Sequence, residues 1–223
     1  TPIQAQGIPA VLTGRDLLGI AQTGTGKTAA FVLPILHRIA LEGKRPAEKT
    51  SHALIVVPTR ELAEQIGDSI RSYSRFMRVT HAVVIGGANP RAQAAKLARG
   101  VDIIVATPGR LLDHMNTRIV TLSQTTQVVL DEADQMLDMG FIPAIRQIMA
   151  KVNAERQTML FSATMPKEIR KLADDFMKQP LEVSVAPTAK PIETIDQCVM
   201  HLDGGAKRGV LVSLLRSGEV ERA

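Results

Sequence analysis

Short runs of apolar residues recur along the first 185 positions of the chain and alternate with segments of helical spacing. Most of these runs are hydrophobic at nearly every position, which differs from the in–out alternation of a half-exposed strand. This pattern predicts strands that are covered on both faces, as in a parallel sheet. The expected strands are Leu17–Ala21, Ala53–Val57, Ala82–Ile85, Asp102–Ala106, Gln127–Leu130, Thr158–Phe161 and Leu181–Val185.

Helical segments are expected between these strands, and several of them have a proline at their first turn, where its missing N–H costs nothing. Alternation of strand and helix predicts the α/β class, with a doubly wound, mostly parallel sheet and helices on both faces. Ligands of such sheets bind beyond the carboxyl ends of the strands. The expected helices follow Gly26, cover Glu61–Phe76 and Arg91–Ala98, and start near Gly109, Pro143 and Pro166.

The composition changes at residues 186–191, where two prolines lie among small and charged residues. Such a segment predicts a linker. Beyond it we expect one strand, Ile195–Leu202, and one helix, Lys207–Leu215, which are too few to bury a core of their own. The predicted organisation is a first domain at 1–185, a linker at 186–194 and the truncated start of a second domain at 195–223.

The charge of the chain indicates what kind of partner it has. Net charge is +5 and the pI is about 9.6, which favours a polyanion, although a basic soluble protein without one is the alternative. Aromatic residues are only 3%, so contact with a phosphate backbone, with weak sequence preference, is favoured over base stacking. A single cysteine, Cys198, and the absence of any membrane-length apolar run favour a cytoplasmic protein without a membrane partner.

A candidate phosphate-binding loop, Ala21–Thr28, follows an expected strand and opens an expected helix. Its glycines let backbone N–H groups point at phosphate oxygens, its lysine supplies positive charge to the β and γ phosphates, and its last hydroxyl can ligate Mg²⁺. A glycine-rich turn with an exposed lysine is the alternative, which the strand–helix context disfavours. The predicted ATP-binding residues here are Thr23, Gly24, Thr25, Gly26, Lys27 and Thr28.

Two carboxylates, Asp131 and Glu132, come directly after the apolar run Gln127–Leu130. Such a pair at the end of a buried strand is unfavourable unless a cation or a proton partner lies close by. We expect Asp131 and Thr28 to hold Mg²⁺ and Glu132 to orient or deprotonate an attacking water. The predicted catalytic residues are therefore Lys27, Asp131 and Glu132. The alternative is the solvated acidic first turn of a helix.

Seven segments resemble, in order, the motifs of the DEAD-box ATP-dependent RNA helicases, specifically of their first RecA-like domain. Ala21, where other phosphate loops have glycine, is that family's own variant. Met139-Gly140-Phe141, and the Lys190-Pro191-Ile192 run before Ile195-Asp196-Gln197, further resemble its bacterial RhlE-like branch. The seven segments are Thr1-Pro2-Ile3-Gln4, Ala21–Thr28, Pro58-Thr59-Arg60-Glu61-Leu62-Ala63, Gly86-Gly87, Thr107-Pro108-Gly109-Arg110, Asp131-Glu132-Ala133-Asp134 and Ser162-Ala163-Thr164.

The resemblance implies roles that the residues alone would not give. Gln4 would pair with the adenine edge, whereas a lone glutamine in a first helix would otherwise be solvated. Ser162 and Thr164 would reach Asp134 and link nucleotide state to unwinding; capping of the helix near Pro166 is the other interpretation. Without the resemblance, Arg60 and Arg110 would be interpreted as ordinary surface arginines. The resemblance implies contacts with the RNA backbone for Pro58, Thr59, Arg60, Gly86, Gly87, Thr107, Gly109 and Arg110.

The function implied by the resemblance is RNA-stimulated ATP hydrolysis coupled to local separation of an RNA duplex. An ATP-dependent RNA clamp without significant unwinding, or an unrelated P-loop ATPase, are the alternatives. In this family the arginine fingers belong to the second RecA-like domain, and such residues are worth about 10³–10⁵ in rate. We therefore expect the 223-residue chain alone to bind adenine nucleotide weakly, to hydrolyse it very slowly and to unwind nothing.

Overall fold

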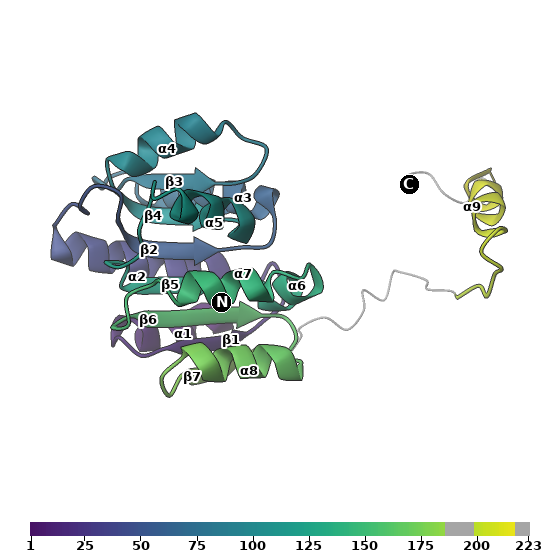
Figure 1. The fold of residues 1–223 in the computed structure, drawn as a ribbon. Helices are drawn as coiled ribbons and strands as arrows, with labels where there is room; N and C mark the ends of the chain where they lie inside the picture. Colours follow the sequence, from purple (N-terminus) through teal and green to yellow (C-terminus); the bar gives the residue numbers. More distant parts are fainter. Residues whose placement is uncertain (186–198, 217–223) are drawn as a thin grey trace. The chain divides into compact units, whose positions relative to one another are not determined.

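The computed structural model describes residues 1–185 and 199–216. The chain divides into two compact units, Thr1–Pro187 and Thr188–Ala223. The first unit contains a seven-stranded sheet with the strand order β3-β4-β2-β5-β6-β1-β7 (Figure 1). Every strand pair is parallel. The mostly parallel sheet predicted from the apolar runs is therefore confirmed.

All the strands expected in the first unit are present, with ends that lie within two residues of the prediction. The inner strands are buried along their length, whereas the edge strands β3 and β7 are buried at alternate positions or less. The strands are β1 (Leu17–Ile20), β2 (Ser51–Val56), β3 (His81–Val84), β4 (Val101–Ala106), β5 (Gln127–Leu130), β6 (Gln157–Ser162) and β7 (Leu181–Ser184).

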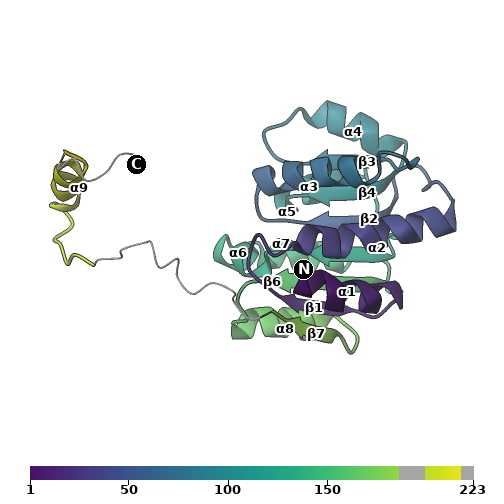
Figure 2. The same cartoon turned by 180° about the vertical axis from the view of Figure 1, so that it is seen from behind.

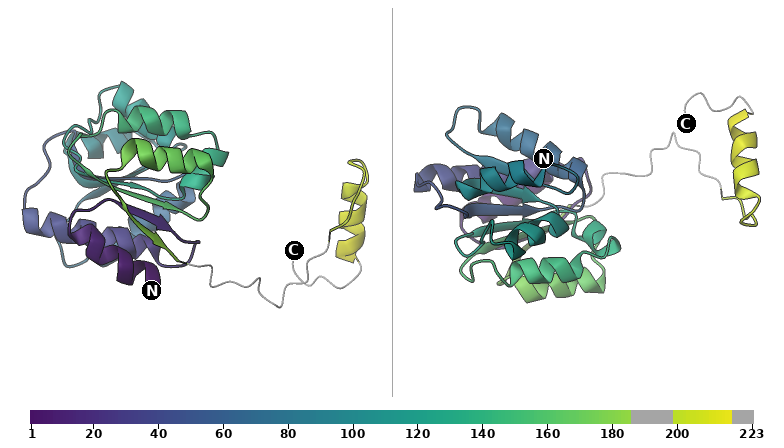
Figure 3. Two further views of the ribbon diagram at one scale, coloured as in Figure 1. Left: turned by 90° about the horizontal axis from the view of Figure 1, so that it is seen from below. Right: turned by 45° about the horizontal axis from the view of Figure 1, so that its top comes forward.

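Helices cover both faces of the sheet, as expected from the strand–helix alternation (Figures 1 and 3). One face, seen in Figure 2, carries α1 (Pro2–Leu12), α2 (Lys27–Glu42) and α3 (Arg60–Tyr73). The expected helix Glu61–Phe76 ends earlier, at Tyr73, and is followed by a turn in which the Met77 N–H donates to the carbonyl of Ser74 at 2.8 Å. The other face carries α4 (Pro90–Ala98), α5 (Pro108–Asn116), α6 (Ala133–Asp138), α7 (Ile142–Met149) and α8 (Lys167–Phe176).

The apolar core lies in two layers, one on each side of the sheet. Alternate residues of β2 enter different layers: Leu54 and Val56 pack with α4–α8, and Ala53 and Ile55 pack with α1–α3. A strand that supplies both layers is hydrophobic at every position. This is the physical reason for the uninterrupted apolar runs in the sequence.

The second unit is described only at 199–216, where the expected helix forms as α9 (Lys207–Arg216). The expected strand Ile195–Leu202 is wrong at residues 199–202, which are irregular; a strand without a neighbour has no partner for its hydrogen bonds. The predicted linker 186–194, Cys198 and the Lys190–Gln197 run lie outside the described residues. No described helix is both long and apolar enough to cross a membrane.

Candidate functional site

The carboxyl-terminal edge of the sheet collects nearly all the residues that the sequence singled out. Ala21 follows β1, Pro58 comes just after β2, and Gly86 and Thr107 lie at the ends of β3 and β4. Asp131 follows β5 directly. Because the strands are parallel, their carboxyl ends meet at one edge, and segments more than a hundred residues apart in the chain become neighbours there.

The phosphate loop has the backbone geometry that its glycines permit. Gly24 and Gly26 have φ angles of +78° and +91°, which a residue with a Cβ adopts only under strain. Gly26 caps α2, so Lys27 is the first residue of that helix. Gln4 lies against the loop and donates from Nε2 to the carbonyl of Gly26 at 3.1 Å. The loop thus combines a helix amino terminus, which attracts anions, with a nearby amide side chain.

Lys27 and Asp131 form a buried ion pair with Nζ and Oδ1 3.7 Å apart. Their exposed fractions are 6% and 2%. Burial raises the pKa of Asp131 to about 6; Lys27 opposes this shift and Glu132 adds to it. Lys27 Nζ has no hydrogen-bond partner among the described residues. A buried ammonium with a single distant carboxylate is costly, and phosphate oxygens with a cation on Asp131 would satisfy both groups. The residues therefore fit a Mg²⁺–nucleotide.

Glu132 has an unusual backbone conformation, with φ 55° and ψ 50° in the left-handed region. Its backbone N–H donates to Asp131 Oδ1 at 3.0 Å, and it caps α6, which begins at Ala133. A non-glycine residue held there stores roughly 1–3 kcal/mol of strain. The helix-start interpretation of the acidic segment is thus partly correct, but only Asp134 lies in the first turn; Asp131 is buried at the strand end.

Asp134 is tied to the end of β6 by the segment that the sequence linked to it. The backbone N–H and the hydroxyl of Thr164 both donate to Asp134 Oδ2 at 2.9 Å. The Ser162 hydroxyl also reaches Asp134: it accepts from the Asp134 backbone N–H at 3.2 Å and so caps α6 from a neighbouring strand. Partial burial would raise the pKa of Asp134, but the hydrogen bonds from Thr164, Ser162 and Gln135 prevail and lower it.

The predicted RNA residues meet in a pocket of about 420 Å³ at the same edge. The Arg60 guanidinium packs on the glycine pair: a Cβ on Gly86 would lie 3.2 Å from Arg60 Nη2, and one on Gly87, at φ +80°, would overlap the same guanidinium. Arg110 Nη1 donates to the carbonyl of Ala88 at 3.3 Å. Gly87 lies against Arg60 but does not line the pocket. The other seven predicted residues line it: Pro58, Thr59, Arg60, Gly86, Thr107, Gly109 and Arg110.

Three further residues line this pocket without having been predicted as part of it: Glu61, Met139 and Phe141. In the sequence, Glu61 belongs to the segment Pro58–Ala63 without a role of its own, and Met139–Phe141 serves only to indicate the RhlE-like branch. Both hydrophobic residues follow α6, so the helix that begins at the acidic segment carries them to the pocket. That placement depends on the short length of α6, which the pattern of apolar residues did not indicate.

Comparison with known proteins agrees with this geometry. The family model for DEAD/DEAH box helicases matches residues 1–172. The chain is 43% identical to the ATP-dependent RNA helicase DeaD of Escherichia coli, covering all of this chain and 35% of DeaD. It is 42% identical to DEAD-box ATP-dependent RNA helicase 30 of Arabidopsis thaliana, covering 97% of this chain and 37% of that protein. The chain thus spans little more than a third of the length of these relatives.

Two solved structures have the same fold. A hypothetical ATP-dependent RNA helicase from Sulfolobus tokodaii matches 83% of this chain and 52% of its own, with a TM-score of 0.75 and 41% identity. The yeast DEAD-box splicing factor Prp28 matches 83% of this chain and 45% of its own, with a TM-score of 0.76 and 36% identity. The sheet and its helices therefore form a RecA-like domain, and the chain belongs to the DEAD/DEAH box helicase family.

Proposed function

We propose that the chain is the ATP-binding part of an ATP-dependent RNA helicase, which couples RNA-stimulated ATP hydrolysis to local separation of an RNA duplex. One observation carries the proposal. The buried Lys27–Asp131 pair, with a lysine Nζ that lacks a hydrogen-bond partner among the described residues, lies at the same sheet edge as the pocket containing Arg60 and Arg110. The names of the relatives, all RNA helicases, support it.

The nucleotide would bind at the phosphate loop. Backbone N–H groups of Thr23–Gly26 would face phosphate oxygens, Lys27 would place its charge beside the β and γ phosphates, and Gln4 would read the adenine edge. Thr28 and Asp131 would hold Mg²⁺, which when bound supplies charge neutralisation to the phosphates. Glu132 would orient the attacking water and accept its proton.

RNA would lie across the carboxyl-edge pocket and be held by its phosphates. Arg60 lies against Gly86 and Gly87, and Arg110 donates to the carbonyl of Ala88, so both guanidinium groups have protein contacts at this edge in the absence of RNA. Pro58, Thr59, Thr107 and Gly109 would contribute backbone and hydroxyl contacts. Such contacts carry little sequence information, so weak sequence preference is expected.

Asp134, Ser162 and Thr164 would couple the two sites. Their hydrogen bonds join the helix that follows Glu132 to the end of β6, so a displacement at Glu132 on nucleotide binding would be passed to the next strand. We also propose the boundaries 1–185, 186–194 and 195–223 for the first domain, the linker and the start of a second RecA-like domain. The RhlE-like branch and a cytoplasmic location complete the proposal; they rest on Met139–Phe141 and on the single cysteine.

The proposal is tested by single-turnover ATP hydrolysis by the purified chain, with single-stranded RNA or with DNA of the same sequence. We expect slow hydrolysis that RNA accelerates more than DNA does, and that Lys27→Ala abolishes. Equal stimulation by DNA would contradict the RNA assignment. In a longer protein that contains this chain, strand separation would distinguish a helicase from a clamp that binds RNA without unwinding it.

A further inference from the structure

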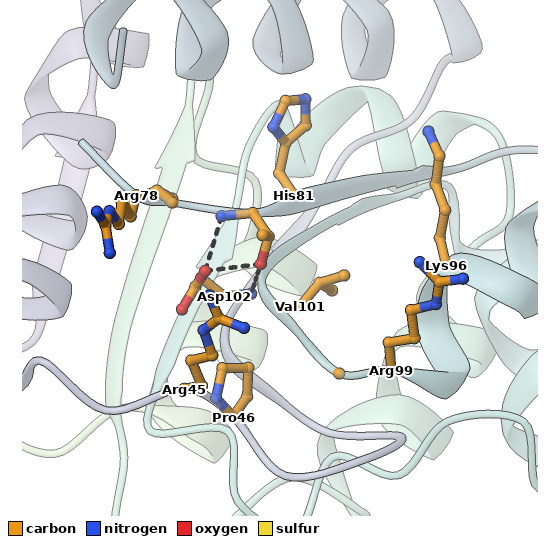
Figure 4. Close-up of a pocket in the computed structure, with 11 residues that line it drawn as sticks. Arg45, Pro46, Arg78, His81, Lys96, Arg99, Val101 and Asp102 are labelled. Atoms are coloured by element: carbon orange, nitrogen blue, oxygen red, sulfur yellow. Dashed lines mark hydrogen bonds between the residues drawn. The ribbon is translucent and has the colours of Figure 1, made fainter. Parts of the chain in front are cut away.

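A second, more basic depression lies at the opposite edge of the sheet, where β3 and β4 begin. It is a pocket of about 550 Å³ whose lining includes Arg45, Arg78, Lys96 and Arg99 (Figure 4). A neighbouring pocket of about 410 Å³ shares Arg45, Arg78, Val79 and Asp102 with it and adds Lys44. Because they share these walls, the two pockets form one elongated depression, which we call the amino-edge groove.

The cations of this groove are not neutralised within the protein. None of Arg45, Arg78, Lys96 and Arg99 makes a side-chain hydrogen bond or an ion pair with another described residue. Elsewhere on the surface arginines do find carboxylates, as in Arg170–Glu182 at 2.7 Å. Like charges that converge without partners repel one another, so an anion bound in the groove would relieve that repulsion.

The carboxylate that lines the groove is already engaged. Asp102 is buried, and its Oδ2 accepts from both the backbone N–H and the hydroxyl of Thr80 at 2.7 Å. His52 lies 3.9 Å from Asp102 and 3.9 Å from Glu42. In Figure 4, Arg78 lies on one side of Asp102, and Lys96 and Arg99 lie together on the other. The rim of the groove therefore presents positive charge to solvent, while Asp102 stabilises the fold through its hydrogen bonds with Thr80.

The fold holds these cations in place. Gly100, at φ +71°, is in contact with the loop that carries Arg45: a Cβ there would lie 2.9 Å from the carbonyl oxygen of Pro46 and would overlap that of Ala47. The neighbouring Val101 N–H donates to the carbonyl of Thr50 at 3.2 Å. Arg45 and Arg99, more than fifty residues apart in the chain, are thus brought together by packing at the start of β4.

The groove also has an exposed aromatic residue beside it in the chain. Phe76 is 89% exposed, and the guanidinium carbon of Arg75 lies 4.5 Å from its ring centroid. Phe76 precedes Arg78 by two residues on the segment between α3 and β3. A solvent-exposed ring with a stacked guanidinium suits a nucleobase, whereas an acidic peptide would require only the cations. The combination favours a nucleic-acid strand as the occupant.

We propose that the amino-edge groove is a second binding site for the phosphate backbone of single-stranded RNA, with Phe76 stacking on a base. The proposal rests on the proposed function in taking RNA as the partner. The two edges are about 20 Å apart, the length of a six-residue strand, and β3 is the outermost strand on this side. An RNA that leaves the carboxyl-edge pocket would pass around β3 to reach the groove and remain tethered there.

The test compares three double variants of the chain in binding single-stranded polyuridine RNA. Arg78→Gln/Arg99→Gln removes charge from the groove, Arg60→Gln/Arg110→Gln removes it from the carboxyl edge, and Lys167→Gln/Lys171→Gln removes the same charge from exposed positions on α8. Each phosphate contact with a single strand contributes about 0.7 to the slope of log affinity against log salt. For the groove variant, which loses two cations, we therefore expect the magnitude of this slope to fall by about 1.4. A slope equal to that of the α8 control would overturn the proposal.

Further arms separate this proposal from the proposed function and from other anions. If only the groove variant weakens binding, the groove holds RNA and the carboxyl-edge assignment fails; if only the carboxyl-edge variant does so, the groove proposal fails. Arg78→Lys/Arg99→Lys should restore the salt slope, and Phe76→Ala should lower affinity about fivefold or more. Polyglutamate should not displace RNA at equal charge. If the groove variant binds RNA as the parent chain does but loses affinity for polyglutamate, the groove is a site for acidic protein.

Discussion

The two edges of the sheet treat a buried carboxylate in opposite ways. At the amino edge, Asp16 accepts backbone N–H groups from Thr158 at 2.7 Å and from Lys178 at 2.6 Å, which ties β6 and the segment before β7 to β1. At the carboxyl edge, Asp131 is also buried but has a lysine at 3.7 Å and the N–H of Glu132 at 3.0 Å.

The difference shows what distinguishes a structural charge from a functional one. The two backbone N–H groups that donate to Asp16 compensate for the desolvation of its carboxylate. Asp131 accepts one backbone N–H, from Glu132, and Lys27 Nζ has no hydrogen-bond partner among the described residues. Both lie beside Glu132, whose backbone conformation is strained. Active sites commonly retain destabilising features of this kind because a ligand completes them. Stability and ligand binding should therefore respond in opposite ways to mutations at the two edges.

The largest effect is expected at the amino edge. Asp16→Ala leaves two amide donors without their acceptor, and we expect the free energy of unfolding to fall by about 2–5 kcal/mol. Nucleotide affinity per folded molecule should not change. Urea denaturation measures the loss, with Asp174→Ala, an exposed aspartate on α8, as the matched control. A loss no greater than in that control would show that Asp16 does not clamp the edge.

The carboxyl edge should show the reverse. In Lys27→Met/Asp131→Asn the buried ion pair is replaced by neutral groups of similar size, a change that is often neutral or stabilising by about 1–4 kcal/mol. We expect an unchanged or higher free energy of unfolding without nucleotide, and about a hundredfold or greater loss of Mg²⁺–ATP affinity, measured by titration of a fluorescent analogue. Destabilisation comparable to that of Asp16→Ala would remove the contrast between the edges.

The same pair predicts a dependence on pH. The pKa of Asp131 is raised to about 6 from 3.8, so the folded state favours the protonated form. The contribution of this protonation to the free energy of unfolding is fully present below about pH 4 and is lost as pH rises through 6. The advantage of Asp131→Asn over the parent chain should therefore shrink by about 1–1.5 kcal/mol between pH 7.5 and pH 5. A constant difference across this range would mean that Asp131 is ionised throughout.

The smallest effect concerns the backbone of Glu132. Glycine tolerates φ near +55° without a steric penalty, so Glu132→Gly should unfold with a free energy about 1 kcal/mol higher than Glu132→Ala, which keeps the strain. Both variants lack the carboxylate and should be equally inactive. Comparing these two separates backbone strain from side-chain chemistry, and equal stabilities would show that the left-handed conformation is not strained.

The sequence predicted the inner strands well because burial on both faces makes them continuous apolar runs, as Leu54–Val57 illustrates. It also predicted which residues lie at the carboxyl edge, since they follow strands directly. The contact between Lys27 and Asp131 depends in addition on the order of the strands in the sheet. The strands β1 and β5 are not adjacent but flank β6, and local sequence patterns do not encode strand order. The amino-edge groove was unpredictable for the same reason, because Arg45, Arg78 and Arg99 come from three separate connections.

The account is tested most directly by hydrogen–deuterium exchange of the chain with and without saturating Mg²⁺–ATP. Protection is predicted in the phosphate loop, residues 21–28, and at residues 131–134, with unchanged exchange around Asp16 at the amino edge. Such a result would place the ligand on the groups left without compensation. Protection confined to other segments, or none at saturation, would contradict the assignment of the carboxyl edge as the nucleotide site.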